Sequence, residues 1–220
     1  MKIKFYLLLL IVSLCLAANS LAASPFKTYH IGILIFEGVE TLDVTGPLEV
    51  FDLANGAVGD KIFKVYTIAI NKKALRTAQQ LKIFSDFCIN DFPPIDILLI
   101  PGGRGINKHV LNNPQLMAWI KQQTEQANLI VSVCAGALVL GQLGLLDGLS
   151  ATTHHLRMKE LALLAPKTHI LSNIKFVDNG RILLSAGITS GIDLSLHIVK
   201  RLAGKKAAID TAQDLEYGSI

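Results

Sequence analysis

Cysteine is scarce in this chain. The 220 residues contain three cysteines, Cys15, Cys88 and Cys134, which are too few for the disulfide framework that stabilises small secreted domains. A hydrophobic core has to hold the fold together instead, and 51% of the residues are hydrophobic. No long polar linker and no internal repeat interrupts the pattern, so we expect one folded domain over residues 24–220.

Charge is also low, at 17% of the residues, and it is nearly balanced. The formal net charge is +4, and without Lys2 and Lys4 it falls to +2, because 19 basic side chains then face 17 acidic ones. This excess is too small to indicate a nucleic-acid partner.

A long membrane-spanning run is missing as well. The apolar run over residues 5–16 is shorter than the roughly 18–20 residues that cross a bilayer. Two lysines precede it and small residues follow it at positions 18–23, which is the pattern of a secretory signal peptide over residues 1–23. The alternative is a membrane anchor. A cleaved signal predicts a periplasmic or secreted protein with no stable membrane span.

Apolar runs alternate with helical patterns along the rest of the chain. Continuous apolar runs are typical of parallel strands that helices cover on both faces, so the alternation predicts a mostly parallel α/β sheet. An Asn-Gly turn between apolar runs predicts a hairpin over residues 175–184. The expected strands are 30–36, 63–70, 96–100 and 128–133, and the expected helices cover 114–126, 137–143, 190–202 and 205–215, with a further helix opening near Thr45 and Pro47.

Three loops follow strands of this sheet, over residues 37–47, 101–105 and 134–136. In open α/β sheets, sites form beyond the carboxyl ends of the strands. We therefore examine these loops for residues that carry chemistry.

Cys134 stands between a buried strand and a small-residue stretch, Ala135-Gly136-Ala137. Strand, sharp turn and helix form the layout of a nucleophile elbow, in which small neighbours accommodate a strained residue. The free N–H groups of the following helix are expected to lower the pKa of the thiol. Two alternatives remain at this point: a buried structural cysteine, or a disulfide with Cys88.

Gly102 and Gly103 follow the strand over residues 96–100. Glycines at this place let the backbone approach a ligand, and their N–H groups can hold a developing negative charge. The alternative is an ordinary glycine-rich turn.

Asp43 is the unusual acid of the first loop, because Leu42 and Val44 flank it and it should be less exposed than Glu37 or Glu40. A carboxyl group in apolar surroundings has a raised pKa and can exchange protons with a reacting group. A local loop or cap hydrogen bond is the alternative role.

Thr153 and His154 end another short strand and could contribute a hydrogen bond in the cleft. Neighbouring histidines point in different directions along an extended chain, so His154 and His155 make a poor metal pair. No other group has the spacing of a zinc site. We expect neither a metal nor a cofactor.

Several stretches, taken together and in this order, resemble the ThiJ/PfpI superfamily, and within it isonitrile hydratases and the sensor half of AraC-type regulators. The resemblance runs from about residue 30 to residue 217. The matching stretches are Phe36 to Pro47, Ile100 to Gly103, Ser132 to Gly136, Gly144 to Gly148, Ala151 to His154 and Gly187 to Asp193.

The resemblance implies a flavodoxin-like three-layer sandwich, a homodimer and a small-molecule electrophile as substrate. For the hydratases it implies that Cys134 attacks an isonitrile carbon and that Asp43 shuttles protons, which yields an N-substituted formamide. The N–H groups of Gly103 and Ala135 would then line an anion pocket. The hydratase pattern has threonine where this chain has Ala135.

A different function is implied by the regulator half of the resemblance. Such domains bind small molecules or sense oxidants through a thiol without turnover. The chain ends at Ile220, without the helix-turn-helix module of these regulators. The exported hydratase or hydrolase is the leading hypothesis, and a binding or redox-sensing module is its alternative.

Overall fold

A seven-stranded sheet with the order β10-β11-β7-β6-β1-β2-β5 runs through the centre of the chain. The structure is a computed structural model that describes residues 27–59 and 61–218, so the predicted signal peptide over residues 1–23 and the predicted domain start at residue 24 lie outside the described residues. All neighbouring strands are parallel except β10 and β11. The strands are β1 (Tyr29–Leu34), β2 (Phe63–Ala69), β5 (Phe87–Cys88), β6 (Ile97–Ile100), β7 (Leu129–Val133), β10 (Phe176–Asp178) and β11 (Ile182–Ser185).

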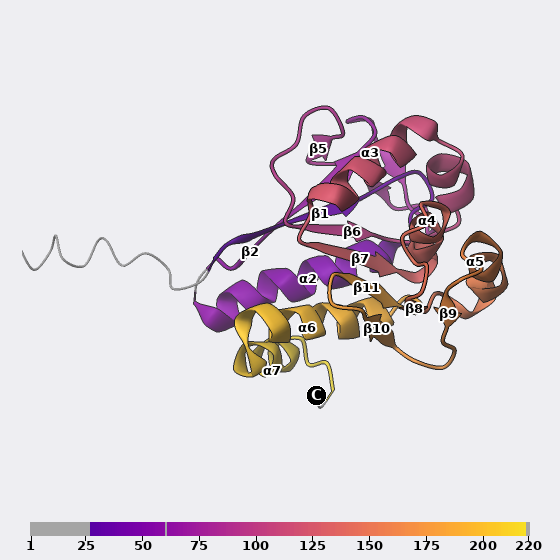
Figure 1. Ribbon diagram of the computed structural model, residues 1–220. Helices are drawn as coiled ribbons and strands as arrows, with labels where there is room; N and C mark the ends of the chain where they lie inside the picture. The colour runs from indigo at the N-terminus through magenta and orange to yellow at the C-terminus, as the bar shows by residue number, and fades with distance from the viewer. Residues whose placement is uncertain (1–26, 60, 219–220) are drawn as a thin grey trace, which may run out of the picture.

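Helices cover both faces of this sheet (Figure 1). On one face lie α2 (Thr41–Val58), α6 (Ser190–Ala203) and α7 (Lys205–Asp214), which pack on one another. On the other lie α3 (Pro114–Gln126) and α4 (Ala137–Gln142), and α5 (Met158–Leu164) packs against α4. The predicted α/β sandwich with a mostly parallel sheet is confirmed.

The central strands β6 and β7 are buried along their whole length. This is the environment that their unbroken apolar sequences predict, since helices exclude water from both faces. The helix predicted over residues 114–126 is also confirmed, and Asn113 caps it by accepting a hydrogen bond from the N–H of Leu116 at 3.1 Å.

The predicted hairpin forms at β10 and β11, with Gly180 at a φ of 84° in its turn. Beside it, Asp178 accepts hydrogen bonds from Arg201 at 3.0 Å and contacts His197 at 2.7 Å.

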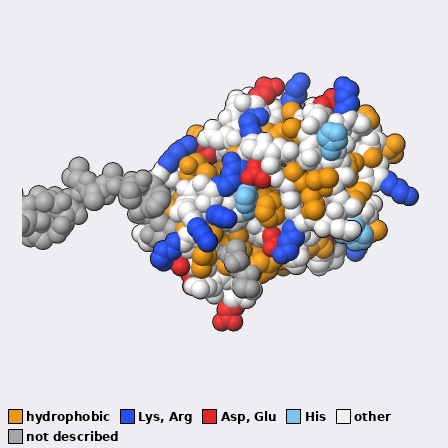
Figure 2. Space-filling model, turned by 60° about the horizontal axis from the view of Figure 1, so that its bottom comes forward, with side chains coloured by type: hydrophobic (Ala, Val, Ile, Leu, Met, Phe, Trp, Pro, Cys, Tyr) orange, Lys and Arg blue, Asp and Glu red, His pale blue; other side chains and the backbone are white. Residues whose placement is uncertain are grey.

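The view in Figure 2 shows Lys and Arg side chains interspersed with acidic and hydrophobic ones. On this face, positive charge forms no continuous patch.

The first helix begins at Thr41, four residues before the predicted cap at Thr45. The reason is a distant side chain: Gln79 Oε1 accepts hydrogen bonds from the backbone N–H and the hydroxyl of Thr41, at 3.1 and 2.7 Å. Pro47 therefore lies inside the helix and cannot donate to the carbonyl of Asp43. The earlier start places Asp43 in the first helical turn.

Short elements escape the sequence prediction. Two-residue strands carry no measurable periodicity, and helices near one turn in length carry little. The elements not predicted are β3 (Leu75–Arg76), β4 (Lys82–Ile83), β5, β9 (His169–Ile170), α5 and the short helices η1 (Ile106–Leu111), η2 (Cys134–Gly136) and η3 (His155–Arg157). The short strand predicted next to Thr153 and His154 is present as β8 (Ser150–Ala151), which ends at Ala151. β3 pairs with β4 and β8 with β9 in two small separate sheets.

Within the described ranges, no helix combines the length and the apolar character needed to cross a membrane.

Phe51 anchors α2 to the sheet. It is fully buried, and its ring centre lies 5.1 Å from that of Phe63 on β2. We expect Phe51→Ala to lower the free energy of unfolding by about 3–5 kcal/mol, because it leaves a cavity in the core. Urea denaturation measures this loss. Asp52→Ala, an exposed change on the same helix, is the control, and an equal loss in both variants would contradict the role of Phe51.

Candidate functional site

Three loops meet beyond the carboxyl ends of the neighbouring strands β1, β6 and β7. The backbone N–H of Glu40 donates to the carbonyl of Gly102 at 3.0 Å, which joins the first loop to the second. A Cβ atom on Gly136 would stand 2.0 Å from the carbonyl oxygen of Ile100, so the third loop lies directly against the end of β6. The structure thus brings together the three loops that the sequence indicates.

Cys134 occupies the turn between β7 and α4 in a left-handed conformation, with a φ of 56°. L-residues rarely adopt this conformation, and surrounding contacts have to impose it. The N–H of Cys134 donates to the carbonyl of Ala186 at 2.7 Å, and its own carbonyl accepts from the hydroxyl of Thr153 at 2.7 Å. The strained elbow that the sequence predicts is present, and hydrogen bonds fix it on both sides.

Asp43 is fully buried in the first turn of α2. Its Oδ2 accepts a hydrogen bond from the N–H of Gly102 at 2.9 Å, whereas Oδ1 has no hydrogen-bond partner among the described residues. Burial raises the pKa of Asp43 from 3.8 to about 7, the nearby Glu40 raises it further, and the Gly102 N–H and the Cys134 thiol oppose this rise. The carboxyl group is therefore half protonated near neutral pH.

The thiol of Cys134 stays protonated. Burial raises its pKa from 9.0 to about 12, and the charge of Asp43 adds to this, against the N–H groups of Ala135 and Ile188, which favour the thiolate. The expected lowering of the pKa is wrong. The helix that should have lowered it is a 3₁₀ turn followed by only six α-helical residues, and the loss of hydration at a 7% exposed side chain outweighs it.

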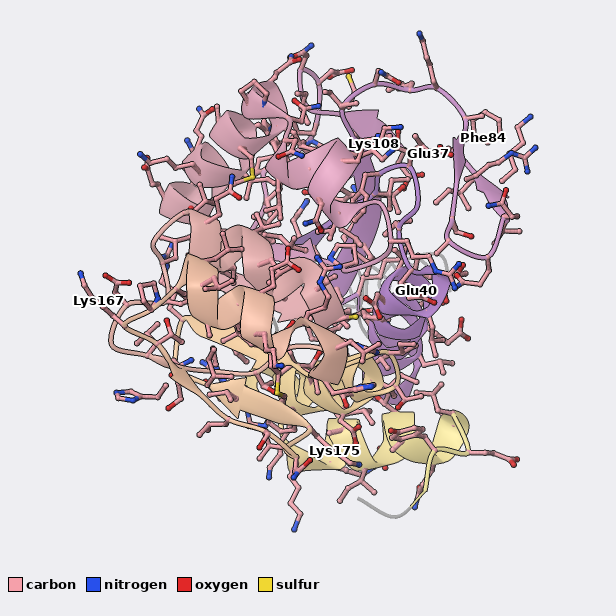
Figure 3. The ribbon with its side chains drawn as sticks, turned by 90° about the vertical axis from the view of Figure 1, so that its right-hand side faces the viewer. Glu37, Glu40, Phe84, Lys108, Lys167 and Lys175 are labelled. Carbon is pink, nitrogen blue, oxygen red and sulfur yellow. The ribbon has the colours of Figure 1, made fainter. Side chains whose placement is uncertain are left out.

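A cavity of about 310 Å³ opens over the sulfur. Charged side chains line part of it: the carboxylate of Glu40 and the guanidinium groups of Arg104 and Arg157. Figure 3 shows Glu40 beside the N-terminal end of α2, while Glu37, whose carboxylate accepts from the N–H of Arg76 at 2.9 Å, lies farther away. The remaining lining residues are Gly103, Cys134, Ala135, His154, Leu156 and Ile188.

The predicted anion-binding N–H groups divide into two sets. Gly102 gives its N–H to Asp43, so this group is already engaged. Gly103 and Ala135 line the cavity itself. Gly102 remains necessary for close approach, since a Cβ atom there would stand 2.5 Å from the nitrogen of Ala135.

The two predicted cleft residues have different positions. Thr153 is fully buried, and its hydroxyl donates a hydrogen bond to the carbonyl of Cys134. It therefore fixes the backbone of the elbow and does not line the cavity over the sulfur. His154 lines that cavity. Burial, followed by the neighbouring His155 and Arg157, lowers its pKa, which favours a neutral imidazole ring.

Sequence reasoning missed five residues that line this cavity, namely Glu40, Arg104, Leu156, Arg157 and Ile188. Glu40 reads as a solvated loop acid, and Arg157 follows no strand that the sequence reveals. Ile188 has a φ of 32°, which is unusual for a β-branched residue, and its N–H points at the sulfur of Cys134. The only signal for it was its place within the matching stretch from Gly187 to Asp193.

Cys88 and Cys134 are free thiols, so the structure contains no disulfide between them. Cys88 lies on the edge strand β5. Among residues 27–59 and 61–218, no group of three or more His, Cys, Asp or Glu side chains is placed to hold a metal ion.

The raised pKa of Asp43 makes stability depend on pH. The folded state keeps the proton up to about pH 7, whereas the unfolded chain releases it near pH 3.8, so the free energy of unfolding falls as the pH rises between these values. Since one pKa unit corresponds to 1.36 kcal/mol, the loss attributable to Asp43 is about 4 kcal/mol. Because Asn does not titrate, we expect the free energy of unfolding of Asp43→Asn to lack this decrease of about 4 kcal/mol between the two pH values.

Urea denaturation of both proteins at pH 4, 5.5 and 7 measures the effect. Asp96 and Asp178 have lowered pKa values and remain in both proteins, so the difference between the two curves isolates Asp43. Parallel curves would contradict a buried carboxyl group that titrates near neutrality.

Comparison with known proteins gives consistent matches. The model of the DJ-1/PfpI family matches residues 29–201. Isonitrile hydratase from Pseudomonas putida is 34% identical over 195 residues, which cover 86% of this chain and 78% of that protein. The HTH-type transcriptional regulator GbdR from Pseudomonas aeruginosa is 23% identical over 190 residues, 86% of this chain but 51% of the regulator.

Solved structures agree with these matches. A ThiJ/PfpI family protein from Pseudomonas syringae superimposes with a TM-score of 0.78 at 26% identity, over 89% of this chain and 77% of the other. The crystal structure of an AraC family transcriptional regulator from Pseudomonas putida gives a TM-score of 0.74 at 20% identity, over 85% of this chain. With its elbow cysteine and its flavodoxin-like sheet, this chain belongs to the DJ-1/PfpI family.

Proposed function

We propose that this protein is a cysteine-dependent hydratase or hydrolase of small carbon electrophiles, and that its reaction is the hydration of an isonitrile to an N-substituted formamide. One observation carries the proposal: the protonated thiol of Cys134 lies beside the buried carboxyl group of Asp43, whose pKa is about 7. The similarity to a protein named isonitrile hydratase supports the choice of substrate.

A neutral thiol and carboxyl pair suits the first step. The terminal carbon of an isonitrile has to gain both a proton and a nucleophile. Asp43 gives its proton to this carbon, the sulfur of Cys134 forms a bond to the same carbon, and the thiol proton passes to the carboxylate. The product is a thioimidate on Cys134, and Asp43 is again neutral. Proton delivery by a positioned carboxyl group contributes about 10²–10⁴-fold to such steps.

The second step consumes one water molecule. Water adds across the carbon–nitrogen double bond, so that its oxygen bonds to the thioimidate carbon and one of its protons goes to the nitrogen. The carbon–sulfur bond then breaks, and the second proton of the water passes through Asp43 to the sulfur as the formamide leaves. The N–H groups of Ala135 and Ile188 stabilise the negative charge that develops on the departing sulfur. Ala135 supplies no hydroxyl to hold the water, and the cavity offers Glu40 and Arg104 for this purpose.

The alternative, a module that binds a small molecule without turnover, is supported by the similarity to the regulator GbdR. Its thiol-sensing form is less well supported, because oxidant sensors depend on a low thiol pKa and the pKa of Cys134 is raised to about 12. Binding of an isonitrile without formamide release would favour the alternative.

Export to the periplasm or the medium is also part of the proposal, and the pattern of residues 1–23 is its support. The homodimer implied by the family resemblance remains a prediction.

Turnover of a small isonitrile tests the nucleophile. We expect purified protein to release the N-substituted formamide, Cys134→Ala to abolish release, and Asp43→Asn to lower kcat by about 100-fold or more. Cys88→Ala, which removes the other thiol of the described chain, is the matched control and should keep the wild-type rate. Gas chromatography of the formamide gives the rate, and equal rates for wild type and Cys134→Ala would rule the mechanism out.

The pH profile tests the protonation state of Asp43. If the carboxylic acid is the active form, kcat/KM stays level below about pH 7 and decreases about tenfold per pH unit above it. A stopped assay between pH 5 and pH 9 measures the profile. A rate that instead rises toward pH 9 would indicate a thiolate as the reacting species and would contradict the neutral pair.

A further inference from the structure

A separate cavity of about 260 Å³, here called the Lys108 cavity, lies where three segments meet. These segments are the loop after β1, the turn between β3 and β4, and the start of η1 with the loop before it. Arg104 lines both this cavity and the one over Cys134, and the two linings share no other residue. The volume lies below the range of about 300–1,000 Å³ that holds drug-sized ligands, so it suits a small ion.

Basic side chains predominate in the Lys108 cavity. Arg104, Lys108 and His109 line it, and Glu37 is the one acid in its lining. The ion pairs that the described residues form involve none of the three basic side chains. Glu37 reaches the cavity from a different segment than Lys108 (Figure 3), and its Oε2 atom accepts from the N–H of Arg76 at 2.9 Å. Two cations against one carboxylate therefore leave positive charge without a counterion.

Thr77 adds a buried hydrogen-bond donor to this lining. Its side chain is only 2% exposed, and its hydroxyl oxygen accepts from the N–H of Leu81 at 3.1 Å. Among the residues that the structure describes, the hydroxyl proton has no acceptor. A buried polar group without its partner is costly, and an anion in the cavity would supply the acceptor.

The walls of the Lys108 cavity are joined by backbone hydrogen bonds. The N–H of Gly38 donates to the carbonyl of Arg76 at 2.7 Å, the N–H of Ala78 to the carbonyl of Val39 at 2.8 Å, and the N–H of Gly105 to the carbonyl of Gly38 at 3.1 Å. These N–H groups are engaged, so a ligand has to be held by side chains. Since the three segments are already fixed to one another, binding costs little ordering of the chain.

We propose that the Lys108 cavity binds a tetrahedral oxyanion of phosphate size, either free or as the head of a phosphate monoester, through Arg104, Lys108 and the hydroxyl of Thr77. A guanidinium group donates two parallel hydrogen bonds to such an anion, and an ammonium group adds a point charge. The donors come from two different segments, which suits an anion with oxygens on several sides and not a planar carboxylate. This site is independent of the proposed reaction at Cys134.

Calorimetric titration at constant ionic strength tests the proposal. We expect sodium phosphate to bind saturably to the purified protein. Lys108→Gln removes one cation at an exposed position and should weaken this binding about tenfold, because a charge-assisted hydrogen bond is lost. Lys121→Gln, at an exposed position on α3 outside the cavity, is the matched control and should bind phosphate as the wild type does. Absence of saturable binding, or equal weakening in the two variants, would overturn the proposal.

Thr77 separates a built site from a general attraction of anions to positive charge. Thr77→Val removes the hydroxyl at nearly constant volume and should weaken phosphate binding about tenfold, whereas Thr77→Ser keeps the hydroxyl and should bind as the wild type does. Thermal unfolding in sodium chloride shows whether both variants are folded. If folded Thr77→Val binds phosphate as tightly as Thr77→Ser, the hydroxyl is not a ligand and the site as proposed is wrong.

The choice of anion tests the chemical class. We expect sodium acetate to compete poorly with phosphate, and acetate binding of equal strength would overturn a tetrahedral site. Glycerol phosphate distinguishes the two sources of the phosphate group. Tighter binding of the ester than of inorganic phosphate would support a phosphate monoester as the ligand, and the reverse order would support the free anion.

Discussion

The hydrogen bond from the Gly102 N–H to Asp43 determines how the site is built. It ties the first turn of α2 to the loop after β6, and it leaves only one oxygen of the carboxyl group free. That oxygen has no hydrogen-bond partner among the described residues, in a place without water contact, so the group avoids negative charge and keeps its proton up to about pH 7. The charge that Asp43 does acquire raises the pKa of the neighbouring thiol. One backbone contact therefore links the position of Asp43 to the protonation state of the Cys134 thiol.

A protonated pair suits a restricted kind of chemistry. Many cysteine enzymes prepare a thiolate before the substrate arrives, and this requires a low thiol pKa. Here the thiol stays protonated and Asp43 loses its proton only near pH 7, so the proposed substrate takes up a proton and a sulfur at one atom. An isonitrile carbon does so, whereas the carbonyl carbon of an amide accepts the nucleophile alone.

Much of this arrangement could be predicted from the sequence. Unbroken apolar runs predicted the central strands. The order of the three loops after these strands predicted that their site residues lie at one edge of the sheet, and these residues are Asp43, Gly102, Gly103 and Cys134. The helix start at Thr41 could not be predicted, because a side chain 38 residues away supplies its cap. Ile188 and Arg157 contact the site from segments with no periodic pattern. The raised pKa of Cys134 depends on the balance between burial and a short helix, which only coordinates reveal.

Gln79 stands in the turn between β3 and β4, far along the chain from the sulfur. Its amide oxygen accepts hydrogen bonds from Thr41, at the start of α2, and its amide nitrogen donates one to Glu40, on the cavity wall. The segment that carries it is a two-stranded ribbon of two residues per strand, with little core of its own. A mutational survey limited to side chains near Cys134 would pass over this ribbon. The tolerance of the candidate site to sequence change therefore depends in part on a surface turn that does not line its cavity.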